Sequence, residues 1–217
     1  MLTSIKGVIF DLDGTLIDSM WLWKEIDIEY LGKRNIAFDK SLQEAIEGMT
    51  FHETAVYIKE RFNISDTIDE MKEEWHFMAK EHYEKNVPLK PGAGEFLAHL
   101  KNVGIKIGIA TSNSRELCEI ALNSLGINEY FDHVTTGNDV SEGKPSPFIY
   151  ITTAAAINVE PDNCLVFEDV PMGILAGKRA GMKVCAVEDD FSRHLRETKA
   201  DIADYFIKDF NDVMEKI

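Results

Sequence analysis

The chain has 217 residues, 45% of them apolar and 28% charged, enough for one core or for one core with a small accessory domain. Its formal net charge of −15 argues against nucleic acid or an anionic membrane surface as the partner, because both bind basic faces. Three cysteines without a Cys-x-x-Cys pair argue against a disulfide framework or a zinc site, and the lack of a secretion signal or a membrane-length apolar stretch predicts a cytoplasmic protein.

The first predicted strand is Gly7–Phe10, a short apolar run. Only helical patterns follow over about residues 19–85, where Leu22, Ile26 and Tyr30 recur every four residues. A second stripe at helical spacing comprises Ile68, Met71, Trp75, Met78 and His82. The predicted division is a catalytic core of residues 1–17 plus 87–217 and a helical cap domain of residues 18–86.

Strands and helices alternate along the rest of the chain. Strands are predicted at Ile105–Ala110, His133–Thr136, Cys164–Phe167, Val184–Val187 and Tyr205–Ile207. Helices are predicted at Ala93–Val103, Arg115–Leu125, Pro147–Ile157 and Pro171–Gly181. This alternation indicates an α/β fold with a doubly wound parallel sheet and right-handed crossovers, accompanied by the second, smaller, all-helical cap.

Two aspartates, Asp11 and Asp13, follow the first strand and precede Gly14. Because alternate residues of an extended segment point the same way, both carboxylates are expected in one volume at the strand's carboxyl end, where open α/β sheets bind ligands. The pair suits phosphoryl transfer, with Asp11 as the nucleophile and Asp13 as the general acid and base. The alternative is a turn with two solvated aspartates, and a calcium loop would lack its third ligand position.

Three further polar positions follow other predicted strands. The Thr111 hydroxyl suits a phosphoryl oxygen, although taken alone the position is better explained as an ordinary helix N-cap. Lys144, held by the proline after it, suits a fixed positive charge against a phosphoryl group, and its alternative is a surface lysine. Glu168 and Asp169 suit Mg²⁺, and their alternative is an exposed acidic turn.

These four motifs are weak singly and specific in their order. They read Asp11-Leu12-Asp13-Gly14-Thr15, Thr111, Lys144 before a proline, and Glu168-Asp169. In that order they resemble the haloacid dehalogenase-like (HAD) hydrolase superfamily, over essentially the whole chain, and the helical insert resembles its small cap. The Asp18-Ser19 pair is common in the phosphoglycolate phosphatase and β-phosphoglucomutase branch.

The resemblance implies a Rossmann-like core and a role for each motif. Asp11 would attack the phosphoryl group and Asp13 would act as acid and base. The Mg²⁺ ligands would be an Asp11 carboxylate oxygen, the Asp13 backbone carbonyl, Asp169, and Glu168 directly or through water. The phosphoryl group would be held by Thr111 and Lys144, which also orient Asp11, and by Gly14, Ser112 and Asn113.

The choice within this branch depends on the cap. Asp13 sets dehalogenation aside, because true dehalogenases do not use an aspartate there. Mutases of the branch carry a cap histidine where this chain has Trp23, and a sugar-phosphate-binding arginine in the region that here reads Gly48–His52 without one. The neighbouring apolar side chains favour a less ionic pocket or simply cap packing: Met20, Trp21, Trp23, Met49 and Phe51. A solvated or capping role is expected for His52.

We therefore predict a Mg²⁺-dependent phosphatase that hydrolyses a small phosphorylated metabolite through an aspartyl-phosphate on Asp11. A β-phosphoglucomutase-type phosphotransferase is the second reading, and a phospho-ligand-binding protein without turnover is the third. Closure of the cap over the substrate would expel bulk water. A monomer is expected, with a dimer left open, and the sequence does not name the substrate.

Overall fold

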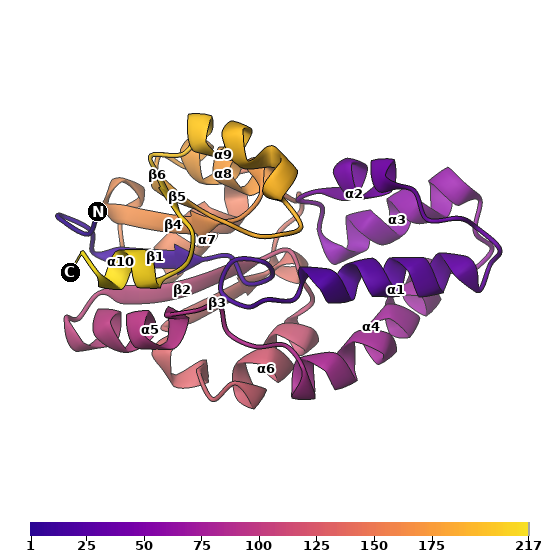
Figure 1. Ribbon diagram of the computed structural model, residues 1–217, viewed down its shortest axis with the longest axis horizontal. Helices are drawn as coiled ribbons and strands as arrows, with labels where there is room; N and C mark the ends of the chain where they lie inside the picture. The colour runs from indigo at the N-terminus through magenta and orange to yellow at the C-terminus, as the bar shows by residue number, and fades with distance from the viewer. Residues whose placement is uncertain (217) are drawn as a thin grey trace.

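The computed structural model describes residues 1–216, which contain a six-stranded parallel sheet flanked by helices (Figure 1). The strands are β1 (Gly7–Phe10), β2 (Lys106–Thr111), β3 (His133–Thr136), β4 (Cys164–Glu168), β5 (Lys183–Val187) and β6 (Tyr205–Ile207). Their order is β3-β2-β1-β4-β5-β6, and Phe10 of β1 pairs with Ile109 of β2 and Phe167 of β4. The carboxyl ends of these three strands therefore lie side by side.

The strands bury both faces, as expected of a parallel sheet. Val8 and Phe10 belong to one hydrophobic core and Ile9 to the other, because successive side chains point to opposite faces. In the first core Phe10 stacks on Phe167 with ring centroids 5.2 Å apart. The first face is covered by α5 (Ala93–Asn102), α6 (Arg115–Ser124) and α10 (Asn211–Met214), and the second by α7 (Phe148–Ala156), α8 (Pro171–Arg179) and α9 (Arg196–Ile202).

The predicted fold class is confirmed, and most errors lie at element ends. The bounds of β1, β3 and β6 match the prediction, β2 is shifted by one residue, and β4 and β5 are each one residue longer. The predicted α5, α6 and α7 ran too far because they included the C-cap residues Val103, Leu125 and Ile157. The short helices α9 and α10 were not predicted, because segments this short do not display a helical period.

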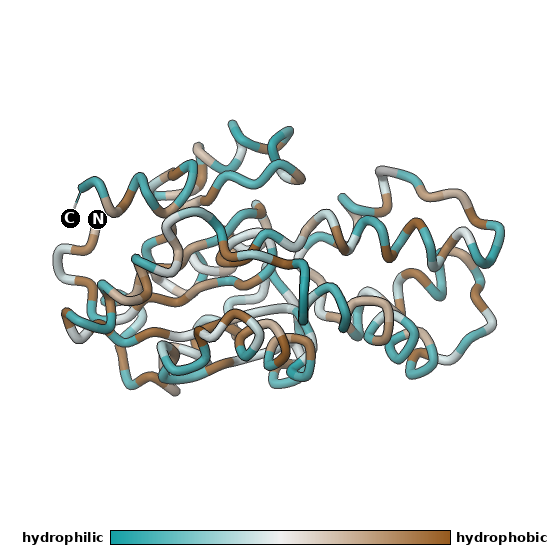
Figure 2. Tube along the Cα trace, turned by 60° about the horizontal axis from the view of Figure 1, so that its bottom comes forward, coloured by the Kyte–Doolittle hydropathy of each residue, from teal (hydrophilic) through white to brown (hydrophobic). Residues whose placement is uncertain are grey.

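Between β1 and α5 the chain forms four helices, which lie at one end of the sheet (Figure 1). These are α1 (Met20–Gly32), α2 (Lys40–Ile46), α3 (Phe51–Phe62) and α4 (Ile68–Lys85). Hydrophobic and hydrophilic residues alternate along them (Figure 2). The predicted stripe of α1 is buried, but that of α4 was partly wrong: Ala79 and Tyr83 take the buried face, and Met78 and His82 lie on its flank.

Two connecting segments join these helices to the sheet. The N–H of Asp18 donates to the Pro88 carbonyl at 2.9 Å, and the N–H of Lys90 donates to the Leu16 carbonyl at 2.9 Å. The two connections therefore run side by side. The division at residues 18 and 86 stays a prediction. Within residues 1–216, no helix is both long and apolar enough to cross a bilayer.

Candidate active site

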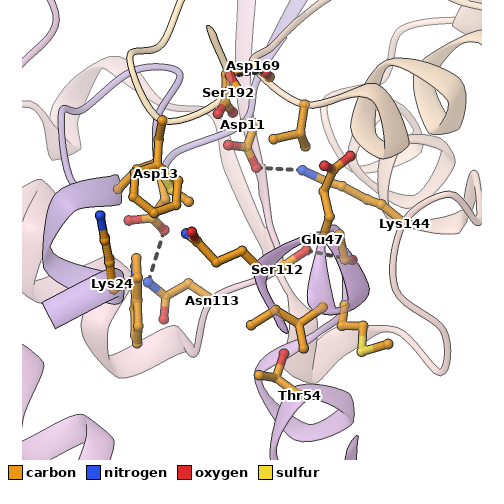
Figure 3. Close-up of a pocket in the computed structure, with 18 of the residues that line it drawn as sticks. Asp11, Asp13, Lys24, Glu47, Thr54, Ser112, Asn113, Lys144, Asp169 and Ser192 are labelled. Carbon is orange, nitrogen blue, oxygen red and sulfur yellow. Dashed lines mark hydrogen bonds and ion pairs between the residues drawn. The ribbon is translucent and has the colours of Figure 1, made fainter. Parts of the chain in front are cut away.

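Strand ends bring the sequence-predicted residues together. Asp11 follows β1, Thr111 ends β2, and Glu168 ends β4 with Asp169 directly after it. Lys144 reaches the same place from the loop between β3 and α7. All five are buried, with exposed fractions between 0% and 6%. Figure 3 shows Asp11, Lys144 and Asp169 converging on one small volume.

A buried ion-pair network ties the nucleophile candidate to the sheet. The Lys144 ammonium donates to Asp11 Oδ1 at 2.5 Å and also to Glu168 Oε1. The same Glu168 oxygen accepts a hydrogen bond from the Tyr150 hydroxyl at 2.7 Å, and Oε2 accepts from the N–H groups of Asp169 and Val170. Both Glu168 oxygens are thus engaged by protein donors. Such a network tolerates burial only because each charge has partners.

The charges of this network do not balance. Burial raises the pKa of Asp11 to about 7, although the Lys144 ammonium acts in the opposite direction. Burial would lower the pKa of Lys144, and the Asp11 and Glu168 carboxylates outweigh it, so that this pKa is raised. Burial first, and the Glu168 and Asp11 charges next, raise the pKa of Asp169 well above its ordinary value. One ammonium for three carboxylates leaves room for a further cation.

The donor atoms of this cluster fit a divalent cation. Asp11, Glu168 and Asp169 each offer an oxygen within 4.8 Å of the others. Thr15 Oγ1 donates to Asp169 Oδ1 at 2.9 Å, whereas Asp169 Oδ2 is buried without a hydrogen-bond partner among residues 1–216. Gly14 permits this approach, because its φ of +82° favours glycine and a Cβ there would lie 2.5 Å from Asp169 Oδ2. An orphaned carboxylate oxygen among hard oxygen donors suits a hard divalent cation.

Asp13 is held by the core and the cap together. Its Oδ1 accepts hydrogen bonds from Ser19 Oγ at 2.6 Å and from the Tyr83 hydroxyl, and its Oδ2 accepts from Asn113 Nδ2 at 3.0 Å. The Tyr83 oxygen in turn accepts from Trp23 Nε1 and Asn113 Nδ2, each at 3.0 Å. Sequence reasoning missed Ser19 and Tyr83 as site residues. The Asp18-Ser19 pair was a signal for the first, and the misplaced α4 stripe hid the second.

The residues after β2 take different positions. Thr111 Oγ1 accepts a hydrogen bond from the Asn113 N–H at 3.1 Å at the strand end. Ser112 faces the cap instead, where its carbonyl accepts from the Phe51 N–H at 3.1 Å. The N-cap of α6 is Ser114, whose Oγ accepts from the Leu117 N–H. The capping alternative considered for Thr111 therefore applies to a residue three positions later.

The cap is hydrogen-bonded to the loop that carries Lys144. Thr50 and Glu53 form a capping box at the start of α3, and the Glu53 carboxylate also accepts from the Gly143 N–H at 3.1 Å. Gly48 has a φ of +80°, and a Cβ there would lie 2.9 Å from the Lys144 carbonyl. Close backbone approach thus fixes the cap over the catalytic edge of the sheet.

A pocket of about 650 Å³ extends from the catalytic edge into the cap. One face of α1 lines it, at Met20, Trp23, Lys24 and Asp27, which have the i, i+3, i+4, i+7 spacing of a single helix face. Asp11, Asp13, Lys144 and Asp169 line its catalytic end, and the loop after β5 contributes residues 190–192 and 194–195. The pocket therefore connects the strand-end carboxylates with the helices of the cap.

The apolar cap residues divide between pocket and packing. Four of them line the pocket: Met20, Trp23, Met49 and Phe51. Trp21 instead meets the His82 ring edge-on at 5.5 Å and is not part of the lining. His52 is exposed and also outside the lining, in keeping with the solvated role considered for it.

Comparison with known proteins points to a single family. Residues 8–187 match the family model described as haloacid dehalogenase-like hydrolase. The chain is 34% identical over 208 residues to the validoxylamine A 7′-phosphate phosphatase of Streptomyces hygroscopicus subsp. limoneus, covering 96% of this chain and 95% of that protein. It is 35% identical over 189 residues to the β-phosphoglucomutase of Bacillus subtilis, covering 82% and 81%.

A solved structure gives the same result. The β-phosphoglucomutase of Clostridium difficile superposes with a TM-score of 0.82 at 26% identity, covering 96% of this chain and 92% of that one. The matches therefore include enzymes that hydrolyse a phosphate ester and enzymes that transfer a phosphoryl group between positions of a sugar.

Proposed function

Because the chain belongs to the haloacid dehalogenase-like hydrolase family, we propose that it is a Mg²⁺-dependent phosphatase of a small phosphorylated metabolite, with Asp11 as its nucleophile. The observation that carries this proposal is the buried ion pair of Asp11 with Lys144, next to the unpartnered oxygen of Asp169. A carboxylate oriented by a fixed ammonium, at the end of an open pocket, is arranged for attack on phosphorus.

The reaction proceeds in two displacements. Lys144 holds Asp11 Oδ1, so that Oδ2 is free to attack phosphorus while the bond to the leaving oxygen breaks and Asp13 gives that oxygen a proton. Asp13 then takes a proton from water as the water attacks phosphorus, which releases phosphate and restores Asp11. Ser19, Tyr83 and Asn113 keep the Asp13 carboxyl in place during both steps.

Mg²⁺ would be held by Asp11, Asp169 and the Asp13 backbone carbonyl. Glu168 fits a role through water better than direct ligation, because its oxygens already accept four hydrogen bonds. When bound, the ion supplies positive charge that offsets the repulsion between a phosphoryl dianion and the Asp11 carboxylate. Thr111, Ser112 and Asn113 stay proposed phosphate contacts, with Gly14 and Lys144.

A mutase is the second candidate, supported by the two β-phosphoglucomutase matches. Hydrolysis is preferred because the described pocket lining contains no arginine to hold a second phosphate. Trp23 occupies the position of the expected cap histidine and donates its indole N–H to Tyr83. We also propose a cytoplasmic location, in keeping with three buried free cysteines, and a monomeric state.

The deciding experiment measures products. Wild-type protein is incubated with p-nitrophenyl phosphate and with β-glucose-1-phosphate, each with Mg²⁺ and with chelator. We expect Mg²⁺-dependent release of inorganic phosphate from both. Formation of glucose-6-phosphate in place of phosphate would favour the mutase, and no turnover of either ester would favour a phospho-ligand-binding protein.

The variant Asp11→Asn tests the nucleophile. It should form no covalent adduct when exposed to radioactive acetyl phosphate, whereas Asp13→Asn should retain label because release of the phosphoryl group is slowed. As a matched control we choose Asp69→Asn, the same change at an exposed position of α4. Label on Asp11→Asn protein at the wild-type level would contradict the assignment.

A further inference from the structure

The cap end of the pocket contains a carboxylate that the proposed chemistry does not use. Asp27 lies two turns along α1 from Met20, on the face that lines the pocket. Its side chain is partly buried, and none of the side chains that the structure describes lies within hydrogen-bond or ion-pair distance of it. Burial alone raises the pKa of Asp27 to about 7. A carboxylate in this position gains from a cation that enters the pocket.

Acidic side chains outnumber basic ones along the lining of this pocket. Glu44, Glu47 and Asp190 also line the pocket, whereas the described basic side chains beyond the catalytic edge are Lys24 and His194. The Lys24 ammonium lies 5.9 Å from the centre of the Phe191 ring. Like charges repel, so this pocket disfavours a leaving group that carries its own anion.

Aromatic rings line the same pocket. Trp23 lies one turn before Asp27 on the same face of α1. Its ring meets Phe51 with centroids 5.8 Å apart, and Phe51 meets Trp75 at 5.5 Å. The faces of such rings attract cations, most strongly for tryptophan. A carboxylate and an aromatic face at one place are the groups that bind an ammonium.

We propose that the cap end of this pocket binds a protonated amine on the leaving group of the substrate, with Asp27 as its counter-ion and Trp23 as its aromatic wall. This inference rests on the proposed phosphatase function and names the substrate class within it. A neutral hydroxyl could donate one hydrogen bond to the Asp27 carboxylate but would leave the buried charge without compensation. A second anion would add to the repulsion.

The position of Asp27 also sets the length of the substrate. Seven residues of helix separate it from Met20, near the catalytic end, which is about 10 Å along the α1 axis. The amine must therefore be separated from the phosphoryl group by a spacer of several bonds. A short amino alcohol phosphate would place its amine beside the catalytic aspartates instead.

Matched synthetic esters test the inference. The probes are 6-aminohexyl phosphate and 6-hydroxyhexyl phosphate, which are of equal length, and the pair 2-aminoethyl and 2-hydroxyethyl phosphate. We expect the wild-type kcat/KM to favour the long amine over the long alcohol about tenfold, and a ratio near one for the short pair. A ratio near one for the long pair, or equal discrimination at both lengths, would overturn the proposal.

Two variants locate the effect. Asp27→Asn should bring the amine-to-alcohol ratio of the long pair close to one, whereas Glu25→Gln, which removes a carboxylate from an exposed position of the same helix, should leave that ratio at the wild-type value. Persistence of the tenfold ratio in Asp27→Asn would exclude Asp27 as the counter-ion. The short pair measured on wild-type protein stays decisive if this variant does not fold.

The failure of this inference is distinguishable from failure of the proposed function. Turnover of p-nitrophenyl phosphate by wild-type protein reports the catalytic end alone. If that ester is not hydrolysed, calorimetric titration of wild-type protein with 6-aminohexyl phosphate still measures amine binding. Binding no tighter than that of 6-hydroxyhexyl phosphate would refute the amine site without reference to catalysis.

Discussion

Tyr83 connects the cap to Asp13, the proposed acid and base, by a hydrogen bond. The variant Tyr83→Phe tests how much this hydrogen bond contributes to stability and to catalysis. The hydroxyl is buried on α4, donates to Asp13, and accepts from Trp23 Nε1 and Asn113 Nδ2. The variant removes a hydrogen bond to the Asp13 carboxyl and leaves a buried donor without its acceptor, which costs about 1–3 kcal/mol. Asn113 keeps its other partner, Asp13 Oδ2, so that Trp23 Nε1 is the donor left unpaired. We expect the unfolding free energy to fall by about 1–3 kcal/mol.

The same change should slow catalysis, because Asp13 then keeps only Ser19 and Asn113 as side-chain partners. A loss of about tenfold in kcat for p-nitrophenyl phosphate corresponds to about 1.4 kcal/mol of transition-state stabilisation. Urea unfolding and steady-state kinetics measure the two effects. The matched control is Tyr57→Phe in the same cap, which removes a hydroxyl paired only with Arg61. Indistinguishable results for the two variants would refute the idea that the Tyr83 hydroxyl fixes Asp13.

Three further predictions concern charge. Because burial raises the pKa of Asp27 to about 7 from 3.8, this carboxyl stabilises the fold below about pH 4, and that contribution is lost as pH rises to 7. Urea unfolding should therefore show Asp27→Asn gaining about 1–3 kcal/mol on wild type between pH 4 and 7.5, and a constant difference would contradict this. Asp169→Asn should stabilise Mg²⁺-free protein by about 1–3 kcal/mol in thermal unfolding while abolishing turnover, since a neutral amide replaces a buried carboxylate that lies near the Glu168 and Asp11 charges and has one oxygen unpartnered among residues 1–216; destabilisation would argue against the charge imbalance. Lys199→Met should raise the Mg²⁺ concentration for half-maximal activity about tenfold, because the buried ammonium holds Ser192, whose hydroxyl donates to the Asp169 carbonyl. An unchanged Mg²⁺ titration would show that this chain of contacts does not reach the metal site.

The sheet and its strand-end residues were predictable because their signals are local. Asp11 and Thr111 are set by short apolar runs that end in a polar residue, and a parallel sheet aligns all such ends. The sequence alone treated Glu168 and Asp169 as one acidic pair. Consecutive side chains at a strand end point in opposite directions, so Glu168 turns to Lys144 and Tyr150 while Asp169 turns to Thr15.

What sequence reasoning missed depends on contacts between distant segments. The predicted buried stripe of α4 included Met78 and His82, because thioether and imidazole side chains are as suitable for burial as alanine is. The structure buries Ala79 and Tyr83 instead, since α4 packs against both α1 and α6. Tyr83 therefore reaches Asp13, which is 70 residues away in the sequence. The hydrophobic periodicity of a single segment does not predict this contact between Tyr83 and Asp13.

The charge of the pocket also bears on the choice between phosphatase and mutase. A mutase must hold a second phosphate at the far end of the pocket while the first reacts with Asp11. In this chain Asp27, Glu44 and Glu47 line the pocket, and a second dianion bound there would meet like charges. A hydrolase needs only water to attack the aspartyl-phosphate, and the Asp13 carboxyl, fixed from three sides, is positioned to take its proton. The same carboxylates that would repel a bisphosphate thus attract a leaving group with an amine, so that one set of charges favours both hydrolysis and a cationic substrate.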